Sequence, residues 1–285
     1  MSFLSRTLEE TNALVRGGMV HLLSGPLGLY VINEFPKSGG TWVGQMLGRA
    51  LRVPFPRNRL PAPRPSIMHG HYLNPFGMKS VVVPWRDGRD VMISWYHQCL
   101  FPHELHNEHQ VKRARRDLPF RDYNDVCENL PAFIEWSFTR HRSRRYSWTD
   151  QHFSWADFVN RWYPRKGVTH VRYEALRRNT AVELQRIVLE LSGRRLGPEE
   201  AVTIAEEFSF ERQAGRRPGE EDKRSFLRKG MVGDWRNHFS QGSREIFDRY
   251  AGSELILLGY ERDRSWVRHR EGDEAAGSDE GSPSS

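Results

Sequence analysis

Cysteine is scarce in this chain: Cys99 and Cys127 are the two cysteines among 285 residues. Two cysteines this far apart give neither a framework of disulfide bonds nor the paired spacing of a structural zinc site. The sequence therefore predicts a protein of a reducing compartment, and we expect a cytoplasmic location.

Long apolar runs are missing as well. No stretch approaches the ~20 consecutive apolar residues that a membrane-spanning helix needs. The N-terminal segment MSFLSRTLEETNALVRGG carries acidic side chains early and has no apolar core, unlike a secretory signal peptide. We therefore expect neither a signal peptide nor a membrane span.

Positive charge is abundant, but it is unevenly distributed. The formal net charge is +7, although residues 271–285 hold five acids and no Lys or Arg, so the remainder stands at +12. A basic body suggests an anionic ligand, nucleic acid or a membrane surface as its partner. The acidic tail has no apolar periodicity and is predicted to be disordered, which leaves residues 1–270 as one domain.

Apolar patterns of strand and helix type alternate along that domain. Buried strands are predicted at 29–35, 66–73, 79–85 and 167–173. Helices are predicted at 5–23, 41–51, 154–163, 179–193 and 198–208, and the segment 244–260 closes the fold. This alternation is typical of an α/β fold with a central parallel sheet flanked by helices. The polar segment 103–147 is interpreted as an insertion or lid.

The third of these strands ends next to polar residues that can start a helix. Pro84 is expected near the strand's end, because a central strand cannot spare a backbone donor. Asp87 or Asp90 is expected to cap the helix that follows.

The sequence PKSGGTW (36–42) joins the first strand to a helix. Such a turn directs backbone N–H groups and the helix N-terminus at one point, which attracts an anion. Gly39 and Gly40 permit close backbone approach, Lys37 adds a positive charge, and Ser38 and Thr41 add hydroxyl donors. These seven residues alone fit an ordinary tight turn equally well.

Three blocks of the sequence, in order, resemble the cytosolic-type sulfotransferases. PKSGGTW resembles that family's 5′-phosphosulfate loop, P-K-S-G-T-T-W, and WRDGRDVMISWYH (85–97) resembles its 3′-phosphate motif, with Arg86 and Ser94. FLRKGMVGDWRNHF (226–239) resembles its R-K-G-x-x-G-D-W block, with Arg228, Lys229 and Gly230.

The resemblance implies a P-loop-like sulfotransferase fold. It also implies transfer of a sulfuryl group from 3′-phosphoadenosine 5′-phosphosulfate to a hydroxyl or amine of a small molecule. Lys37 to Thr41 would hold the 5′ side of this donor, and Arg86 suits the 3′-phosphate because its planar fork binds oxygens in pairs. Trp42, Tyr173 and Phe210 match positions near the adenosine, although Phe210 is equally well explained as a core residue.

A histidine pair lies between the first two blocks, in IMHGHY. The family has K-T-H with a catalytic histidine there, so the match makes His71 the general base and puts His69 in the place of the lysine. His69 is the alternative base, because the spacing from His71 to Arg86 is short for the family. Lys37 would stabilise charge on the leaving phosphate, and Ser38 would restrain that lysine. No metal is expected, since no Asp/His cluster is evident.

Two features depart from the family pattern or lie outside it. Gly40 replaces a hydroxyl residue that is common in the family, so the Thr41 hydroxyl would contact the phosphate without help from a hydroxyl at position 40. The basic runs KRARR (112–116) and RHRSRR (140–145) either meet an acidic acceptor or form solvated helix faces. Segment 103–147 would shape the acceptor pocket.

Three alternative functions were weighed against the sulfotransferase. A kinase with an atypical phosphate loop lacks the string G-x-x-x-x-G-K-[ST], in which the lysine follows the glycines. A basic nucleic-acid-binding module requires arginines and aromatics on one surface, whereas the arginines here are scattered, so no nucleic acid is expected. An inactive scaffold is opposed by the intact Lys37, Arg86 and Ser94. Steroid, phenol, lipid, glycan and peptide hydroxyls all remain compatible as acceptors.

Overall fold

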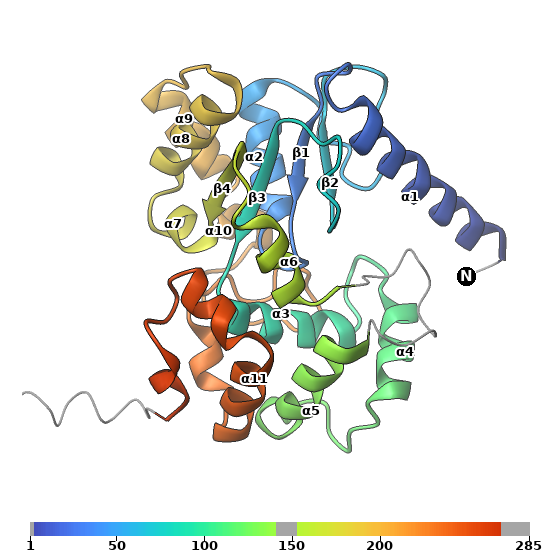
Figure 1. Cartoon of the computed structure of the whole chain (residues 1–285), viewed down its shortest axis with the longest axis vertical. Helices are drawn as coiled ribbons and strands as arrows, with labels where there is room; N and C mark the ends of the chain where they lie inside the picture. Colours follow the sequence, from blue (N-terminus) through green and yellow to red (C-terminus); the bar gives the residue numbers. More distant parts are fainter. Residues whose placement is uncertain (1–2, 141–152, 269–285) are drawn as a thin grey trace, which may run out of the picture.

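The computed structural model of the chain describes residues 3–140 and 153–268 (Figure 1). The predicted acidic tail, 271–285, and all but the first residue of the RHRSRR run lie outside the described residues. Within the described ranges, no helix is both long enough and apolar enough to cross a membrane.

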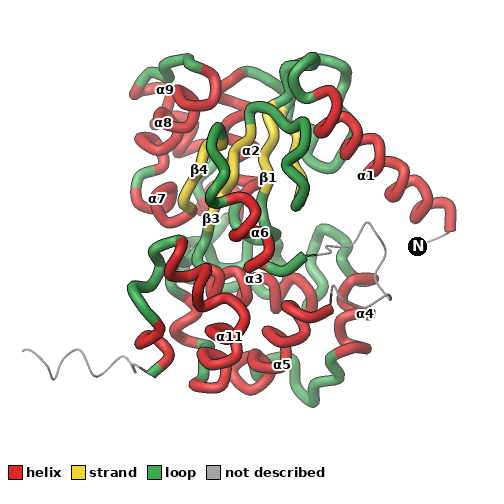
Figure 2. Tube along the Cα trace, viewed as in Figure 1, coloured by secondary structure: helices red, strands yellow, loops and turns green. Residues whose placement is uncertain are grey.

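Four parallel strands form the central sheet, as predicted (Figure 2). They are β1 (Tyr30–Asn33), β2 (Ile67–Gly70), β3 (Val81–Trp85) and β4 (Val168–Arg172). Their order in the sheet is β2-β1-β3-β4, so the chain returns to the sheet on both sides of its first strand. Helical connections between parallel strands cover the sheet on both faces, which makes the strands almost continuously apolar.

Pro84 lies near the end of the third strand, as predicted. β3 pairs with β1 only at Val81 and Val82, so Pro84 lies beyond that pairing, opposite Val171 of β4. The missing N–H of the proline therefore falls outside the β1–β3 ladder.

Helices connect and flank the strands, and those expected from the sequence begin and end close to the expected residues. They are α1 (Phe3–Leu23), α2 (Gly40–Leu51), α3 (Gly88–Leu100), α4 (Glu108–Asp117), α5 (Val126–Thr139), α6 (Trp155–Trp162), α7 (Tyr173–Arg178), α8 (Thr180–Ser192), α9 (Pro198–Glu207), α10 (Phe210–Ala214) and α11 (Gln241–Leu257), with short 3₁₀ turns η2 (Asp234–Asn237) and η3 (Arg264–Val267). Asp87 caps α3 through the Arg89 N–H, so the first of the two proposed caps is confirmed.

The two faces of the sheet bury different side chains, because successive strand residues point in opposite directions. Ile32, Val82 and Val171 face a core that includes Leu47 of α2 and Ile187 of α8. The other face packs on a larger, aromatic core. That core includes Val31, Val83, Trp155, Phe133 and Phe247.

The larger core draws on a group of helices that lies on one side of the sheet in Figure 1: α3, α4, α5 and α11. Helices α4 and α5 belong to 103–147, the segment interpreted as an insertion or lid. Ala114 of α4 and Leu130 and Phe133 of α5 are buried in this core. The two helices are therefore part of the body of the domain, and a lid role for the segment stays a prediction.

Candidate active site

A cavity of about 270 Å³ opens among residues that follow the carboxyl ends of β1, β3 and β4. Ligands of open α/β sheets gather at this edge. All but two of the site residues expected from the sequence line it: Lys37, Gly39, Gly40, Thr41, Trp42, Arg86, Ser94, Tyr173, Phe210, Arg228, Lys229 and Gly230. The two exceptions are Ser38, which is buried, and His71.

The loop after β1 has an unusual backbone. Lys37 has φ 73° and Gly39 has φ 102°, both in the left-handed region that favours glycine. A Cβ at position 39 would lie 2.9 Å from the Tyr173 ring, so only glycine fits here. Strained backbone of this kind is concentrated at functional sites, and it delivers the chain directly to the first turn of α2.

Lys37 lies inside the cavity against an aromatic ring. Its Nζ atom lies 3.7 Å from the Phe226 ring centroid and donates to the Phe226 carbonyl (3.4 Å) and to Gln98 Oε1 (3.3 Å). Desolvation lowers the pKa of Lys37 to about 7, repulsion from Arg86 lowers it further, and Glu34 opposes the shift. Gln98 and the Phe226 carbonyl thus hold Lys37 Nζ in this structure, and the restraint by Ser38 stays a prediction.

Glu34 is a site residue that the sequence analysis missed. Its buried carboxylate accepts the Gly40 N–H at 2.5 Å and lies 2.9 Å from His69 Nε2. A Cβ at position 40 would lie 2.5 Å from the Glu34 carboxyl carbon. The glycine that replaces the family's hydroxyl residue therefore makes room for this acid, and that departure was the one signal in the sequence from which a nearby bulky group could have been inferred.

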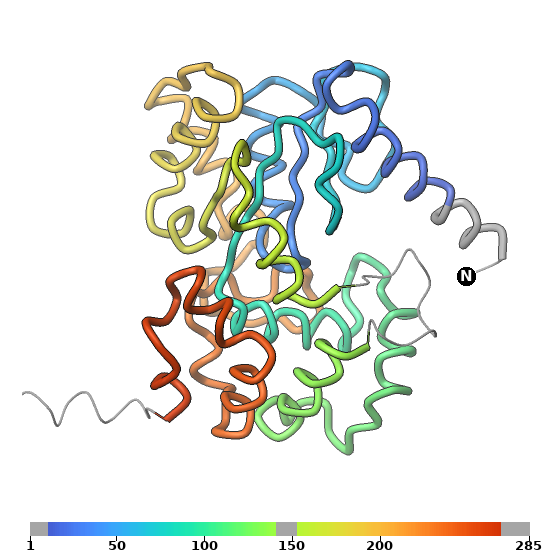
Figure 3. Tube along the Cα trace, viewed as in Figure 1, coloured from blue at the N-terminus to red at the C-terminus, as the bar shows by residue number. Residues whose placement is uncertain are grey.

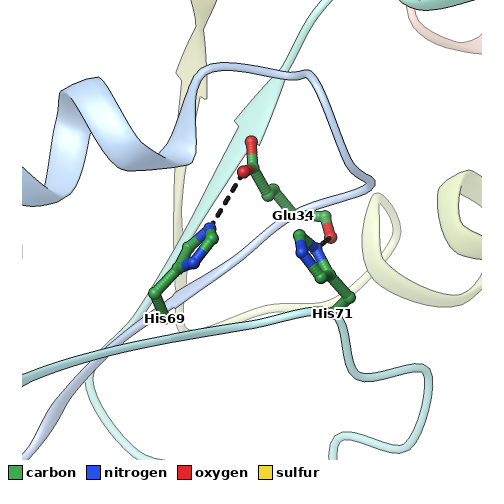
Figure 4. Close-up of side chains that lie close together, drawn as sticks. All are labelled: Glu34, His69 and His71. Atoms are coloured by element: carbon green, nitrogen blue, oxygen red, sulfur yellow. Dashed lines mark hydrogen bonds and ion pairs between the residues drawn. The ribbon is translucent and has the colours of Figure 1, made fainter. Parts of the chain in front are cut away.

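The two histidines of HGH lie beside Glu34 (Figure 4). His71 Nδ1 lies 2.8 Å from the Glu34 backbone oxygen, and because a carbonyl only accepts, Nδ1 carries the hydrogen. Nε2 of the neutral ring therefore keeps its lone pair. The His71 side chain is exposed, yet the protein around it displaces enough water to lower the pKa of His71 to about 4, helped by repulsion from His69. The imidazole is thus neutral at pH 7.

The sequence analysis expected no Asp/His cluster. The fold nevertheless brings one ligand atom each of Glu34, His69 and His71 within 4.8 Å of one another. The sequence does not reveal this group because Glu34 directly follows β1 and the histidines lie at the end of β2. These two strands pair in parallel, with Ile32 opposite His69 and Asn33 opposite Gly70.

Arg86 lies at the end of β3 and reaches across the cavity. Its guanidinium donates to the Lys37 carbonyl (3.2 Å) and to the Met231 carbonyl (3.1 Å) and lies 4.6 Å from the Tyr173 ring centroid. Its Nε is buried and has no hydrogen-bond partner. Ser94, from α3, lines the same cavity. An unpaired buried N–H and a hydroxyl that line one cavity are donors suited to an anion.

Two carboxylates position the C-terminal block next to Arg86. Asp234 accepts hydrogen bonds from Arg228 and Lys229, each at 2.5 Å. Asp90, buried on α3, accepts the backbone N–H groups of Gly233 (2.7 Å) and Trp235 (2.9 Å). Asp90 was considered only as a helix cap, and its role of joining two distant segments was missed.

Aromatic side chains form one wall of the cavity. Trp42 donates its Nε1 hydrogen to the Phe208 carbonyl at 2.8 Å, and its ring lies 5.9 Å from that of Tyr173. Phe210 is buried and also lines the cavity, so its place near the adenosine stays a prediction that its position allows. Gly230 has no room for a Cβ, which would lie 2.5 Å from the Phe210 ring. The wall offers flat apolar surface in the same cavity as Lys37 and Arg86.

The role of Asp90 can be tested by amide exchange. Asp90→Ala leaves two buried N–H donors unpaired, which costs about 1–3 kcal/mol. We expect the amides of Gly233 and Trp235 to exchange hydrogen with solvent faster, measured by NMR or mass spectrometry. Asp125→Ala removes a carboxylate–amide bond at the start of α5 and should leave both amides unchanged. Unchanged exchange in Asp90→Ala would show that other contacts hold the block.

Solved structures with this fold are known. Mouse sulfotransferase SULT7A1 complexed with PAP aligns with a TM-score of 0.60 at 18% identity, covering 90% of this chain and 94% of that one. Retinol dehydratase in complex with androsterone and inactive cofactor PAP aligns with a TM-score of 0.53 at 16% identity, covering 86% and 85%. At these identities the likeness establishes the P-loop-like sulfotransferase fold.

Similarity is also found at the level of sequence. Sulfotransferase 2A1 of Homo sapiens is 32% identical over 108 residues, which are 34% of this chain and 38% of that protein. The amine sulfotransferase of Oryctolagus cuniculus is 24% identical over 276 residues, 80% of each chain. The chain thus matches about two fifths of the first relative's length and most of the second's. The family model named Sulfotransferase domain matches residues 63–259, well over half of the chain, and the chain therefore belongs to the sulfotransferase domain family.

Proposed function

We propose that the protein is a sulfotransferase that moves the sulfuryl group of 3′-phosphoadenosine 5′-phosphosulfate to a hydroxyl or amine of a small molecule. The observation that carries the proposal is one cavity with a cationic group at each of two positions, Lys37 after β1 and Arg86 after β3, and an aromatic wall that includes Trp42 and Tyr173. An adenosine with phosphate on both sides of its ribose has the same distribution of charge and apolar surface. Family membership supports the reaction class.

The residues present fit this donor. The loop from Lys37 to Thr41 would hold the 5′ side, where the backbone begins α2. Arg86 and Ser94 would hold the 3′-phosphate together with Arg228–Gly230, and the unpaired Nε of Arg86 is the free donor that such a contact needs. Trp42, Tyr173 and Phe210 would contact the adenine. No metal is part of this proposal.

The bound donor supplies the sulfuryl group, and the chain's own residues orient and stabilise the reactants. The Lys37 ammonium would stabilise charge that develops on the leaving phosphate. His71 Nε2 would accept the proton that the acceptor gives up. His71 is favoured over His69 because its ring is exposed and its Nε2 is open, whereas His69 is buried and paired with Glu34.

The alternatives are less well supported. In the phosphate loop the lysine precedes the glycines, unlike the loop of a kinase. Family membership also favours the sulfotransferase over a nucleic-acid-binding module. The acceptor itself and the cytoplasmic location stay predictions.

Donor recognition can be tested with adenosine 3′,5′-bisphosphate, which carries both phosphates. At about 100 times its Kd it should stabilise the protein by about 2.7 kcal/mol, visible as a raised Tm. ATP with Mg²⁺, which has no 3′-phosphate, and DNA should leave the Tm almost unchanged. Arg86→Ala should remove the shift. An equal shift with ATP would contradict the proposed 3′-phosphate clamp.

The catalytic roles can be tested by turnover with labelled donor and a panel of acceptors. His71→Ala should lower kcat by about 10²–10⁴-fold, the usual contribution of a general base, while adenosine 3′,5′-bisphosphate still binds. Lys37→Ala should lower kcat by at least about 10²-fold. His106→Ala removes a histidine whose side chain is 88% exposed and should have no effect. Full activity in His71→Ala with a loss in His69→Ala would move the base to His69.

The lowered pKa of Lys37 predicts proton uptake on donor binding. With a pKa of about 7, Lys37 is largely neutral at pH 8.5, and an anion bound beside it would raise that pKa. Binding of adenosine 3′,5′-bisphosphate at pH 8.5 should therefore take up close to one proton, and at pH 5.5 almost none from this group. Calorimetry in two buffers of different ionisation enthalpy measures the uptake. Lys37→Met should abolish it, and equal uptake in that variant would assign the proton elsewhere.

A further inference from the structure

We propose that Glu34, His69 and His71 form a binding site for a divalent transition metal of the Zn²⁺ type, and that the bound ion switches the enzyme off. The binding site stands on geometry alone. The inhibition rests on the proposed function, because it requires His71 to be the base.

The site is built by the pairing of two strands. Glu34 directly follows β1, and His69 and His71 lie at the end of β2, whose Gly70 is opposite Asn33. One ligand atom from each of the three residues lies within 4.8 Å of the others (Figure 4). Among the described residues, this is the one group of three or more such side chains close enough to hold an ion. The sheet thus fixes the ligands, and only side-chain adjustments are needed to close around a metal.

Two imidazoles and one carboxylate are the nitrogen and oxygen ligands that Zn²⁺ takes, and three protein ligands leave a position open. His71 already has the outer hydrogen bond that metal-binding histidines make, from Nδ1 to the Glu34 carbonyl, and this leaves its Nε2 available. His69 Nε2 and Glu34 Oε1 are 2.9 Å apart and share a hydrogen. A bound ion would take the place of that hydrogen.

The surrounding residues determine how tightly the site would bind a metal ion. Glu34 and His69 are buried, with 4% and 7% of their surfaces exposed, so their positions are well defined. Arg16 donates to the His69 carbonyl and to that of Arg57, which places a cation close by. That charge opposes a second cation, so we expect micromolar rather than nanomolar affinity. Such a site suits regulation better than permanent structural metal.

The ion would act on the reacting groups themselves. Coordination would occupy the Nε2 lone pair of His71, so this nitrogen could no longer accept the acceptor's proton. The site also depends on Gly40, since a side chain there would displace the Glu34 carboxylate. The residue that departs from the family's loop pattern is therefore the one that lets an acid join the two histidines.

Cobalt provides a direct test, because Co²⁺ bound by histidine and carboxylate absorbs visible light whether or not the enzyme turns over. The full-length protein is stripped with EDTA and titrated with Co²⁺ without donor or acceptor. We expect bands that saturate at one ion per chain and are displaced by Zn²⁺. Glu34→Gln, which keeps both histidines, and His71→Ala should each weaken binding at least tenfold, whereas His106→Ala should not.

Activity is then measured with Zn²⁺ at the concentration that displaces cobalt. We expect turnover to fall in proportion to the fraction of sites filled and to return with EDTA. Absent bands, or bands that persist unchanged in a folded Glu34→Gln or His71→Ala variant, would overturn the site. Full turnover at saturating Zn²⁺ would overturn the inhibition. Cobalt bands in a protein that sulfates no acceptor would leave the site standing and refute the proposed function instead.

Discussion

The parallel direction of all four strands is the constraint on which the site depends. Because every strand runs the same way, each chain segment that leaves a strand emerges at the same edge of the sheet. Lys37 follows β1, His71 follows β2, Arg86 follows β3 and Tyr173 follows β4. The order β2-β1-β3-β4 then sets the histidines on one side of the loop from β1 and the arginine on the other. Figure 3 shows how these sequence-distant segments run side by side.

The buried carboxylate of Glu34 joins the loop after β1 to the histidine at the end of β2. Burying an acid costs free energy unless hydrogen bonds or opposite charges compensate for the lost water. Glu34 obtains both, from the Gly40 N–H and from His69, and hydrogen bonding and attraction from these neighbours lower the pKa of Glu34 against the opposing effect of its burial. The same acid thereby fixes the start of α2 and the position of the histidine pair. Its removal would therefore disturb the loop after β1 and the histidine pair together.

The sequence predicted the local features well, since they depend on neighbouring residues. The apolar run before Pro36, the glycines after it and the apolar spacing from Trp42 together marked β1, the loop and α2. The contacts that bind distant segments could not be read in this way. Asp90 looks like one more acid in a helix start, yet its partners are Gly233 and Trp235, more than 140 residues later.

Two residues that line the cavity, Glu104 and Phe226, were missed because their contacts too join segments far apart in the sequence. Glu104 and Phe226 lie in loops whose sequences carry no periodic pattern, and Glu104 accepts the Phe226 N–H across 122 residues. Only the tertiary fold brings them to Lys37. Conversely, Phe210 was correctly placed by its resemblance to the family, although hydrophobicity alone explained it as core.

The cavity holds several positive charges whose contacts within the protein compensate for them only in part. Desolvation is the largest cause of the lowered pKa of Lys37, and repulsion from Arg86 and Arg57 lowers this pKa further. Burial removes water from the Lys37 ammonium. Its contacts with the Phe226 ring and the Phe226 carbonyl compensate for only part of that lost hydration. A multiply charged anion would pair with all three cations at once and would restore the charge on Lys37. The binding free energy of such an anion and the protonation of Lys37 would therefore be coupled, and under the proposed function the lysine would acquire its full charge when the donor binds.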